Sequence, residues 1–113
     1  MRDCLFCRIA RGEIPCGKLY EDGELLAFYD IAPKAPVHFL VIPKAHIASL
    51  AQVTDENSAL CGRALALIAR LSAEKGLDNG FRVVTNTGAA AGQSVPHLHF
   101  HVLAGRDMAW PPG

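Results

Sequence analysis

The stretch VPHLHFHVL, residues 95–103, alternates histidine with apolar residues and decides how the chain is read. It holds three of the chain's five histidines: His97, His99 and His101. Because side chains alternate between the two faces of a strand, the three imidazoles are predicted to share one face, with Leu98, Phe100 and Val102 on the core side. Neighbouring imidazoles then start roughly 6–7 Å apart. This spacing suits either a three-histidine metal site or a row of polar groups around one ligand.

Length and composition predict a single domain, residues 1–113, built around one core. The chain has 11 acidic and 11 basic residues, so its charge gives no reason to expect a nucleic acid or a membrane as partner. No run approaches the roughly 18 apolar residues of a membrane span, and charges interrupt the N-terminal stretch MRDCLFCRIARGEIP. We therefore expect a cytoplasmic protein whose four cysteines are thiols or metal ligands.

Hydrophobic periodicity and turn residues predict an α+β fold. A helical pattern between Thr54, as N-cap, and Gly76, as stop, predicts one long helix. A short N-terminal helix is expected between Asp3, as cap, and Gly12. Strands are predicted at 18–31, as a hairpin around Asp22-Gly23, and at 37–43, 81–87 and 95–103. These elements predict a five-stranded antiparallel sheet with the long helix inserted between the third and fourth strands.

A glycine-rich loop, GAAAGQS at residues 88–94, leads directly into the histidine row. Its glycines let the backbone approach a ligand closely and offer N–H groups to phosphoryl oxygens, while Gln93 and Ser94 add side-chain donors. Imidazole is neutral and nucleophilic near neutral pH, so His99 can attack a phosphate and form a nucleotidyl-histidine intermediate. His101 can contact a phosphate oxygen or protonate the leaving group. The alternative is a row of polar residues on a solvated sheet face.

Several motifs extend the pattern along nearly the whole chain. HLHFHVL, at 97–103, has the form His-φ-His-φ-His-φ-φ, in which φ is apolar. The stretches YEDG, LAFYDI, APVHFLVIPKAHI, GQSVPHLHFHVLAGR and WPPG accompany it. Together they resemble the histidine triad family, and within it the histidine triad nucleotide-binding (Hint) branch. The resemblance implies the histidine triad fold, a homodimer whose two five-stranded sheets join, and a purine nucleotide pocket on each subunit.

The resemblance also implies a reaction, the hydrolysis of a nucleoside 5′-phosphoramidate such as adenosine 5′-phosphoramidate, or of an acyl- or aminoacyl-adenylate. It implies that His99 is the nucleophile, that Asp30 binds the ribose hydroxyls, and that Ile14 and Phe28 line the base. The phosphate contacts that it implies are Asn86, Gly92, Gln93, Ser94 and His101. On the residues alone, Asp30 is equally an Asx-turn residue at a strand end. The spacing of Ile14 and Phe28 favours core residues over a platform for the base, and only the resemblance assigns them to it.

Cys4-Leu5-Phe6-Cys7 is a CxxC motif, which alone supplies two of the four ligands of a structural zinc site. Histidine triad proteins with this N-terminal motif resemble zinc binders, and the resemblance implies the ligands Cys4, Cys7, His46 and His97. Such a Cys₂His₂ site is structural, so catalysis is expected to need no metal. The alternative is a pair of small buried thiols.

Two further residues each keep two interpretations. His38 is either a core histidine or part of a hydrogen-bond network behind the histidine row. Trp110, near the C-terminus, either covers the pocket of a partner subunit or packs on its own subunit.

Three functional hypotheses follow. The first is a metal-independent nucleotide phosphoramidase acting through His99. The second is a zinc hydrolase in which His97, His99 and His101 hold a catalytic metal, although sheet twist makes successive positions diverge. The third is a non-enzymatic nucleotide-binding adaptor that works through its dimer surface. Chelation distinguishes the first two, and nucleotide binding by a His99→Ala variant distinguishes the first from the third.

Overall fold

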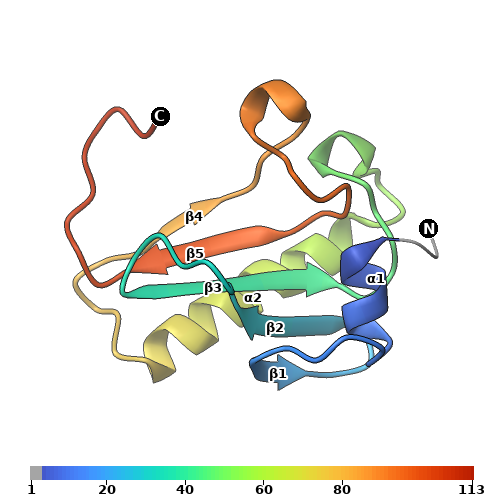
Figure 1. Ribbon diagram of the computed structural model, residues 1–113, viewed down its shortest axis with the longest axis horizontal. Helices are drawn as coiled ribbons and strands as arrows, with labels where there is room; N and C mark the ends of the chain where they lie inside the picture. Colours follow the sequence, from blue (N-terminus) through green and yellow to red (C-terminus); the bar gives the residue numbers. More distant parts are fainter. Residues whose placement is uncertain (1–3) are drawn as a thin grey trace.

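A computed structural model describes residues 4–113 and has the predicted α+β architecture (Figure 1). Its elements are α1 (Leu5–Ala10), β1 (Lys18–Glu21), β2 (Leu25–Tyr29), β3 (Val37–Pro43), the 3-10 turn η1 (Leu50–Gln52), α2 (Ser58–Glu74), β4 (Arg82–Val84), the 3-10 turn η2 (Ala89–Ala91) and β5 (Phe100–Ala104). The five strands form one antiparallel sheet in the order β1-β2-β3-β5-β4. The predicted cap Asp3 lies outside the described residues.

Both faces of the sheet are covered, because the strands place alternate side chains on opposite sides. α2 lies across one face, whereas α1 lies near the end of β3 (Figure 1). The α2 side buries Ala64, Leu67, Ile68 and Leu71 against sheet residues such as Phe39, Val41, Phe100 and Val102. The α1 side buries Cys4, Phe6 and Cys7 with Leu26, Phe28, Leu40 and Ile42. α2 therefore covers the face of the sheet opposite the histidines, and α1 covers the face that carries them.

The triple-histidine stretch is only partly a strand, which corrects the prediction of 95–103. β5 begins at Phe100. Before it, the His97 amide donates to the Val95 carbonyl at 2.8 Å, and the Leu98 amide donates to the Ile47 carbonyl at 2.6 Å. These residues therefore bond to a local turn and to the segment after β3 instead of joining the β3–β5 ladder. The predicted alternation nevertheless holds, since Leu98 is buried in the α2-side core.

The helix and strand boundaries differ from the prediction at three other places, and the first of these is the hairpin, where β2 ends at Tyr29 and not at residue 31. α2 begins at Ser58 and not after Thr54, because the Thr54 amide donates to the Asn57 side chain at 2.7 Å and a turn precedes the helix. Its end is as predicted, with Gly76 at φ +71°. β4 is shorter than the predicted 81–87. Within residues 4–113, no helix is long and apolar enough to cross a membrane.

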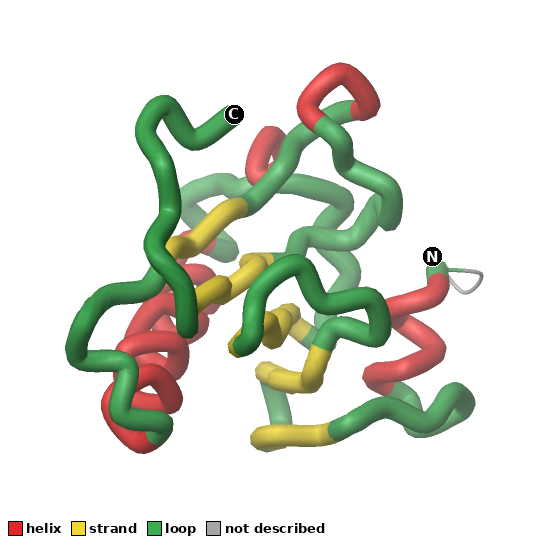
Figure 2. The backbone as a smooth tube through the Cα atoms, turned by 60° about the vertical axis from the view of Figure 1, so that its left-hand side comes forward, coloured by secondary structure: helices red, strands yellow, loops and turns green. Residues whose placement is uncertain are grey.

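After β5 the chain continues as a loop to the C-terminus (Figure 2). The Arg82 guanidinium donates to the Ala109 carbonyl at 3.0 Å and ties this tail to β4. Trp110 is 81% exposed, so the interpretation in which it packs on its own subunit is wrong. Its covering of a partner's pocket stays a prediction.

Candidate active site and metal cluster

A pocket of about 360 Å³ opens on the α1 side of the sheet. Six of the residues predicted to bind nucleotide line it: Ile14, Phe28, Asp30, Ser94, His99 and His101. The predicted phosphate contacts Asn86, Gly92 and Gln93 lie outside this lining, in the connection between β4 and β5. The lining also includes residues that sequence reasoning did not assign to it, among them Phe6, Cys16 and Ile31. The structure thus brings residues from both ends of the chain around His99.

The tautomer of the neutral His99 ring is set by a hydrogen bond to the backbone of His97. Its Nδ1 lies 2.6 Å from the carbonyl oxygen of His97. Since a carbonyl oxygen only accepts hydrogen bonds, Nδ1 carries the proton, and the Nε2 atom of the neutral ring keeps its lone pair. His99 is buried and lines the pocket. It is therefore in the tautomer that a nucleophilic imidazole needs.

A second chain of hydrogen bonds fixes the protonation of His101. The backbone amide of Lys34 donates to His38 Nδ1 at 3.0 Å, so the proton of the neutral His38 ring lies on Nε2. His38 Nε2 lies 3.0 Å from His101 Nδ1 and donates to it. The proton of His101 therefore lies on Nε2. His38 forms the predicted network behind the histidine row, and the row presents one lone pair and one N–H group.

Burial keeps this pair of histidines neutral. Burial lowers the pKa of His101 to about 4, with further lowering by His99 and His38 and an opposing effect of Asp30. Burial also lowers the pKa of His38, again opposed by Asp30. The relay of neutral rings is consequently the state expected at neutral pH. The interpretation of the row as a solvated face is wrong, since His97 and His99 are at most 5% exposed.

Asp30 is an Asx-turn residue whose side chain also lines the pocket, and its predicted contact with a ribose stays a prediction. Its Oδ1 accepts from the Ala32 amide at 2.8 Å, which is an Asx turn, and its Oδ2 lies 3.5 Å from His38 Nε2. The same side chain lines the pocket. A carboxylate at this place is oriented by the turn, and it lies beside the relay that serves His101.

The glycine-rich loop is braced by Gln93. Its Oε1 accepts from the Gly88 amide at 2.9 Å, and its Nε2 donates to the Ala48 and Val95 carbonyls at 2.8 and 3.1 Å. Gly88 and Gly92 have φ of +86° and +90°, a conformation that glycine adopts at little steric cost. In this structure the Gln93 side chain therefore holds the loop between β4 and β5.

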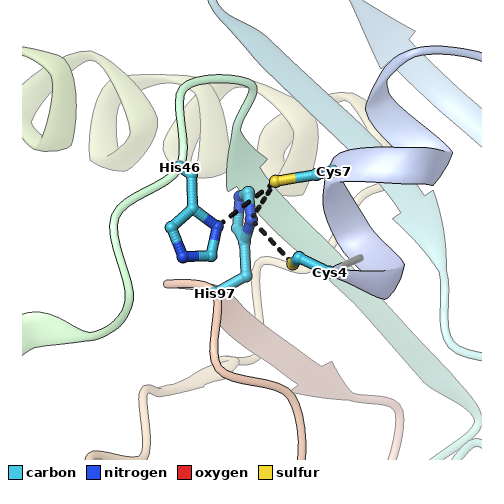
Figure 3. Close-up of side chains that lie close together, drawn as sticks. All are labelled: Cys4, Cys7, His46 and His97. Atoms are coloured by element: carbon cyan, nitrogen blue, oxygen red, sulfur yellow. Dashed lines mark hydrogen bonds between the residues drawn. The ribbon is translucent and has the colours of Figure 1, made fainter. Parts of the chain in front are cut away.

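Four side chains from three distant segments converge beside the histidine row (Figure 3). The ligand atoms of Cys4, Cys7, His46 and His97 all lie within 4.8 Å of one another. Cys7 Sγ lies 3.2 Å from His46 Nδ1, and His97 Nδ1 lies 3.4 Å from Cys4 Sγ and 3.5 Å from Cys7 Sγ. A tetrahedral zinc site with usual bond lengths has ligand–ligand edges of roughly 3.3–3.8 Å. The cluster therefore fits a metal of this kind.

The protonation of the cluster also suits a metal. His97 Nε2 lies 2.7 Å from the Pro43 carbonyl oxygen and must be the donor, which leaves the Nδ1 lone pair directed at the sulfurs. Burial and the adjacent Cys4 thiol raise the pKa of Cys7. A bound cation favours the thiolates and so removes this obstacle. Cys4 and Cys7 form no disulfide.

The three histidines of the row do not form a metal site together. Within residues 4–113, the groups with metal-binding spacing are Cys4–Cys7–His46–His97 and Asp30–His38–His101. His97 turns its Nδ1 to the cysteines, and His99 turns its Nδ1 to a carbonyl. The hypothesis of a catalytic metal held by the whole row is therefore wrong.

Comparisons with known proteins agree with this geometry. Residues 11–108 match the HIT domain. An uncharacterized HIT-like protein of Synechococcus elongatus is 53% identical over 111 residues, which are 98% of this chain and 97% of that protein. A HIT family hydrolase from Legionella pneumophila is 48% identical with a TM-score of 0.96, over 98% of this chain and 100% of that one. A histidine triad nucleotide-binding protein from Candida albicans is 35% identical with a TM-score of 0.82, over 96% and 83%. The chain thus belongs to the HIT, or histidine triad, family.

Proposed function

We propose that the protein is a hydrolase of the Hint type that cleaves purine nucleoside 5′-phosphoramidates, or acyl- or aminoacyl-adenylates, through a nucleotidyl-histidine intermediate on His99. One observation carries the proposal: the hydrogen bond from His99 Nδ1 to the His97 carbonyl leaves the Nε2 lone pair free in a residue that lines the pocket. The HIT family hydrolase from Legionella pneumophila supports hydrolysis as the reaction class.

The reaction proceeds in two steps. His99 Nε2 attacks the α-phosphorus, a new N–P bond forms, and the bond from phosphorus to the leaving amine breaks. The amine takes a proton from solvent, and the positive charge on the imidazole ring is stabilised by the His97 carbonyl at Nδ1. Water then attacks the phosphorus and releases the nucleoside monophosphate, a proton and the neutral His99. Net consumption is one water for each phosphoramidate bond.

His101 serves the phosphoryl group as a hydrogen-bond donor in this scheme. Its low pKa, about 4, makes it neutral near pH 7, and its Nε2 bears the proton through the relay from His38. A neutral imidazole is a weak acid but a good hydrogen-bond donor, so contact with a phosphoryl oxygen is favoured over protonation of the leaving group. Further phosphate contacts are assigned to Asn86, Gly92, Gln93 and Ser94.

The apolar half of the pocket takes the nucleoside. Ile14 and Phe28 line it and are assigned to the purine base, and Asp30 is assigned to the ribose hydroxyls. The histidine triad nucleotide-binding protein from Candida albicans supports a nucleotide as ligand. The carboxylate of Asp30 lines the same pocket and has an oxygen within 4.8 Å of a ring nitrogen of His101, so a ribose bound to Asp30 would lie near the proposed phosphate contact.

The direct test is release of AMP from adenosine 5′-phosphoramidate by the wild type and by His99→Ala, each with and without a strong chelator. Turnover by the wild type that survives chelation and is lost in His99→Ala supports the proposal. AMP binding with no wild-type turnover of phosphoramidate or aminoacyl-adenylate would favour the non-enzymatic adaptor. Loss of turnover on chelation with the fold intact would place a metal in the reaction.

Zinc in the Cys4–Cys7–His46–His97 cluster is part of the proposal, as a structural ion. The cluster is closed, with four protein ligands and no position for substrate, which is typical of structural sites. We expect one zinc ion per chain in the wild type and none in Cys4→Ser by elemental analysis. Cys61→Ser, on α2 and outside the cluster, is the matched control and should keep its zinc.

A homodimer completes the proposal, with the two sheets joined through β4. This edge strand pairs only with β5 among the described strands, and Val83 on it is 38% exposed. Next to it lies a groove lined by Ala69 and Ala73 of α2 and by Phe81, which is 42% exposed. Sedimentation should give a dimer for the wild type, and Val83→Asp should shift it toward monomer. A monomeric wild type would contradict this assembly.

A further inference from the structure

The ring of Phe6 contacts both His99, the proposed nucleophile, and Phe28, which lines the apolar part of the pocket. Its ring centroid lies 5.0 Å from that of His99, with the planes at 88°, and 5.5 Å from that of Phe28, with the planes at 79°. Both are edge-to-face contacts, which hold one ring against another in a preferred orientation. Phe6 is buried and lines the pocket. Moving Phe6 therefore changes the surroundings of both His99 and the base.

Phe6 lies on α1 between the two cysteines of the metal cluster. Cys4 and Cys7 reach His97 and His46, which lie far away in the chain. The backbone hydrogen bonds of α1, by contrast, stay within residues 4–13 of the described chain. A helix of six residues is not stable by itself in water. The position of Phe6 therefore depends on how firmly the cluster and its apolar packing hold α1 on the sheet.

A second route joins the cluster to the nucleophile. The side chain of His97 faces Cys4 and Cys7, and its carbonyl oxygen accepts the His99 Nδ1–H bond at 2.6 Å. A ligand that restrains His97 thus also restrains the acceptor that orients His99. Both routes lead from the cluster to the same side of the pocket.

We infer that metal in the Cys4–Cys7–His46–His97 cluster and nucleoside in the pocket bind cooperatively, with Phe6 as the positioning residue that couples them. The inference rests on the proposed function, because it takes the pocket to be a nucleoside site and the cluster a metal site. The metal holds α1 against the sheet and so fixes the Phe6 ring at the place where the base packs. The nucleoside, in turn, holds α1 where its cysteines meet the histidines. By linkage, each ligand must raise the affinity of the other by the same factor.

The test measures this factor in both directions. Affinity for adenosine and for AMP is measured by calorimetry on metal-free and zinc-loaded protein, and zinc affinity is measured by chelator competition with and without saturating nucleoside. We expect zinc to tighten nucleoside binding about fivefold or more, with an equal change in zinc affinity. Adenosine is included because it has no phosphate, so an equal factor with adenosine excludes direct contact between metal and phosphate.

The variant Phe6→Ala tests whether the coupling between metal and nucleoside passes through the Phe6 side chain. It keeps all four metal ligands, so zinc stoichiometry should stay that of the wild type, while the coupling factor at saturating adenosine should fall to about one. Phe6→Leu, which keeps apolar bulk, replaces it if the alanine variant does not fold. Arg8→Ala, an exposed position on the same helix, is the matched control and should keep the factor.

The outcomes separate the inference from the proposed function. Equal nucleoside affinity of the metal-free and zinc-loaded wild type would overturn the inference, and turnover of phosphoramidate by that protein would leave the function standing. A factor that persists in Phe6→Ala, with the metal-free protein folded by circular dichroism, would overturn Phe6 as the coupling residue. Metal-free wild type that is unfolded would mean that zinc and nucleoside are coupled through folding, and this too would overturn the inference. Absence of nucleoside binding in every form would overturn both.

Discussion

His97 faces the two cysteines with its side chain and orients His99 with its backbone carbonyl. The imidazole of His97 turns to Cys4 and Cys7, while its carbonyl oxygen lies 2.6 Å from His99 Nδ1 and sets the tautomer of that ring. The Phe6 ring packs edge-to-face against both imidazoles, so the Cys4–Cys7–His46–His97 cluster and the pocket lie next to each other. The substitution His97→Ala therefore removes a proposed metal ligand but leaves the carbonyl oxygen that faces His99.

The relay through His38 makes a prediction for His101. His38→Phe keeps an aromatic ring but removes the donor to His101 Nδ1, so His101 is free to adopt either tautomer. Loss of one such hydrogen bond should lower kcat about tenfold, with a smaller effect on KM. Nitrogen-15 NMR of the histidine rings should show Nε2–H for His101 in the wild type and a mixture in the variant. An unchanged kcat together with unchanged His101 shifts would contradict the relay.

The low pKa of His101 predicts loss of stability in acid. Its pKa is about 4 in the folded protein and about 6.5 in the unfolded chain, so the unfolded state binds more protons between these values. This contribution is fully present above pH 6.5 and is lost as the pH falls toward 4. It amounts to about 2 kcal/mol between pH 7 and pH 5.

Urea denaturation of the wild type and His101→Phe, both with chelator present, checks this prediction. Both proteins share the metal cluster, so its titration cancels in the comparison. The wild type should lose about 2 kcal/mol more than the variant between pH 7 and pH 5. Parallel losses would show that His101 titrates normally in the folded protein.

Gln93 is predicted to act on the loop and not only on a ligand. Gln93→Ala removes the acceptor of the Gly88 amide and the donor to the Ala48 and Val95 carbonyls. The free energy of unfolding should fall by about 1–2 kcal/mol, and the Gly88 amide should exchange its hydrogen faster. Wild-type protection of Gly88 in the variant would mean that the loop holds its shape without this side chain.

Replacement by alanine should change the free energy of unfolding in opposite directions at two glycines. At Gly105, φ is +94° and a Cβ would lie 2.8 Å from Pro36 Cβ, so Gly105→Ala should lower the unfolding free energy by about 1–3 kcal/mol. At Gly62, on the exposed side of α2, a Cβ meets nothing within 4 Å. Gly62→Ala should therefore raise it by about 0.5–1 kcal/mol. Denaturant midpoints measure both, and a stabilising Gly105→Ala would refute the steric argument.

Local pattern was enough to predict most of the sheet. β3 lies at the predicted residues, the hairpin turns at Asp22, whose Oδ1 accepts the Glu24 and Leu25 amides, and Gly76 ends α2. The errors arise from hydrogen bonds: the Asn57 side chain holds a turn that delays α2, and the Leu98 amide bonds to the carbonyl of Ile47, far away in the chain. Both involve partners that periodicity does not register, since it counts apolar positions and not hydrogen bonds.

Local sequence pattern predicted only the part of the site that lies within a single segment of the chain. The alternation of the histidine row followed from spacing, but the convergence of Cys4, His46 and His97 came from family resemblance, because no local pattern relates residues so far apart. The edge contact of Phe6 with His99 and the bracing role of Gln93 were missed for the same reason. Their contacts arise only when α1 and the segment after β3 close on β5.

The position of β5 inside the sheet has a consequence for biosynthesis. β5 is the last of the described strands to be synthesised, yet it lies between β3 and β4 and pairs with both. A nascent chain that ends before residue 97 lacks β5, His99 and one of the four side chains of the Cys4–Cys7–His46–His97 cluster. It therefore has neither the proposed nucleophile nor all four of the proposed metal ligands. Metal binding by the cluster and the proposed reaction therefore both require that synthesis has passed β5.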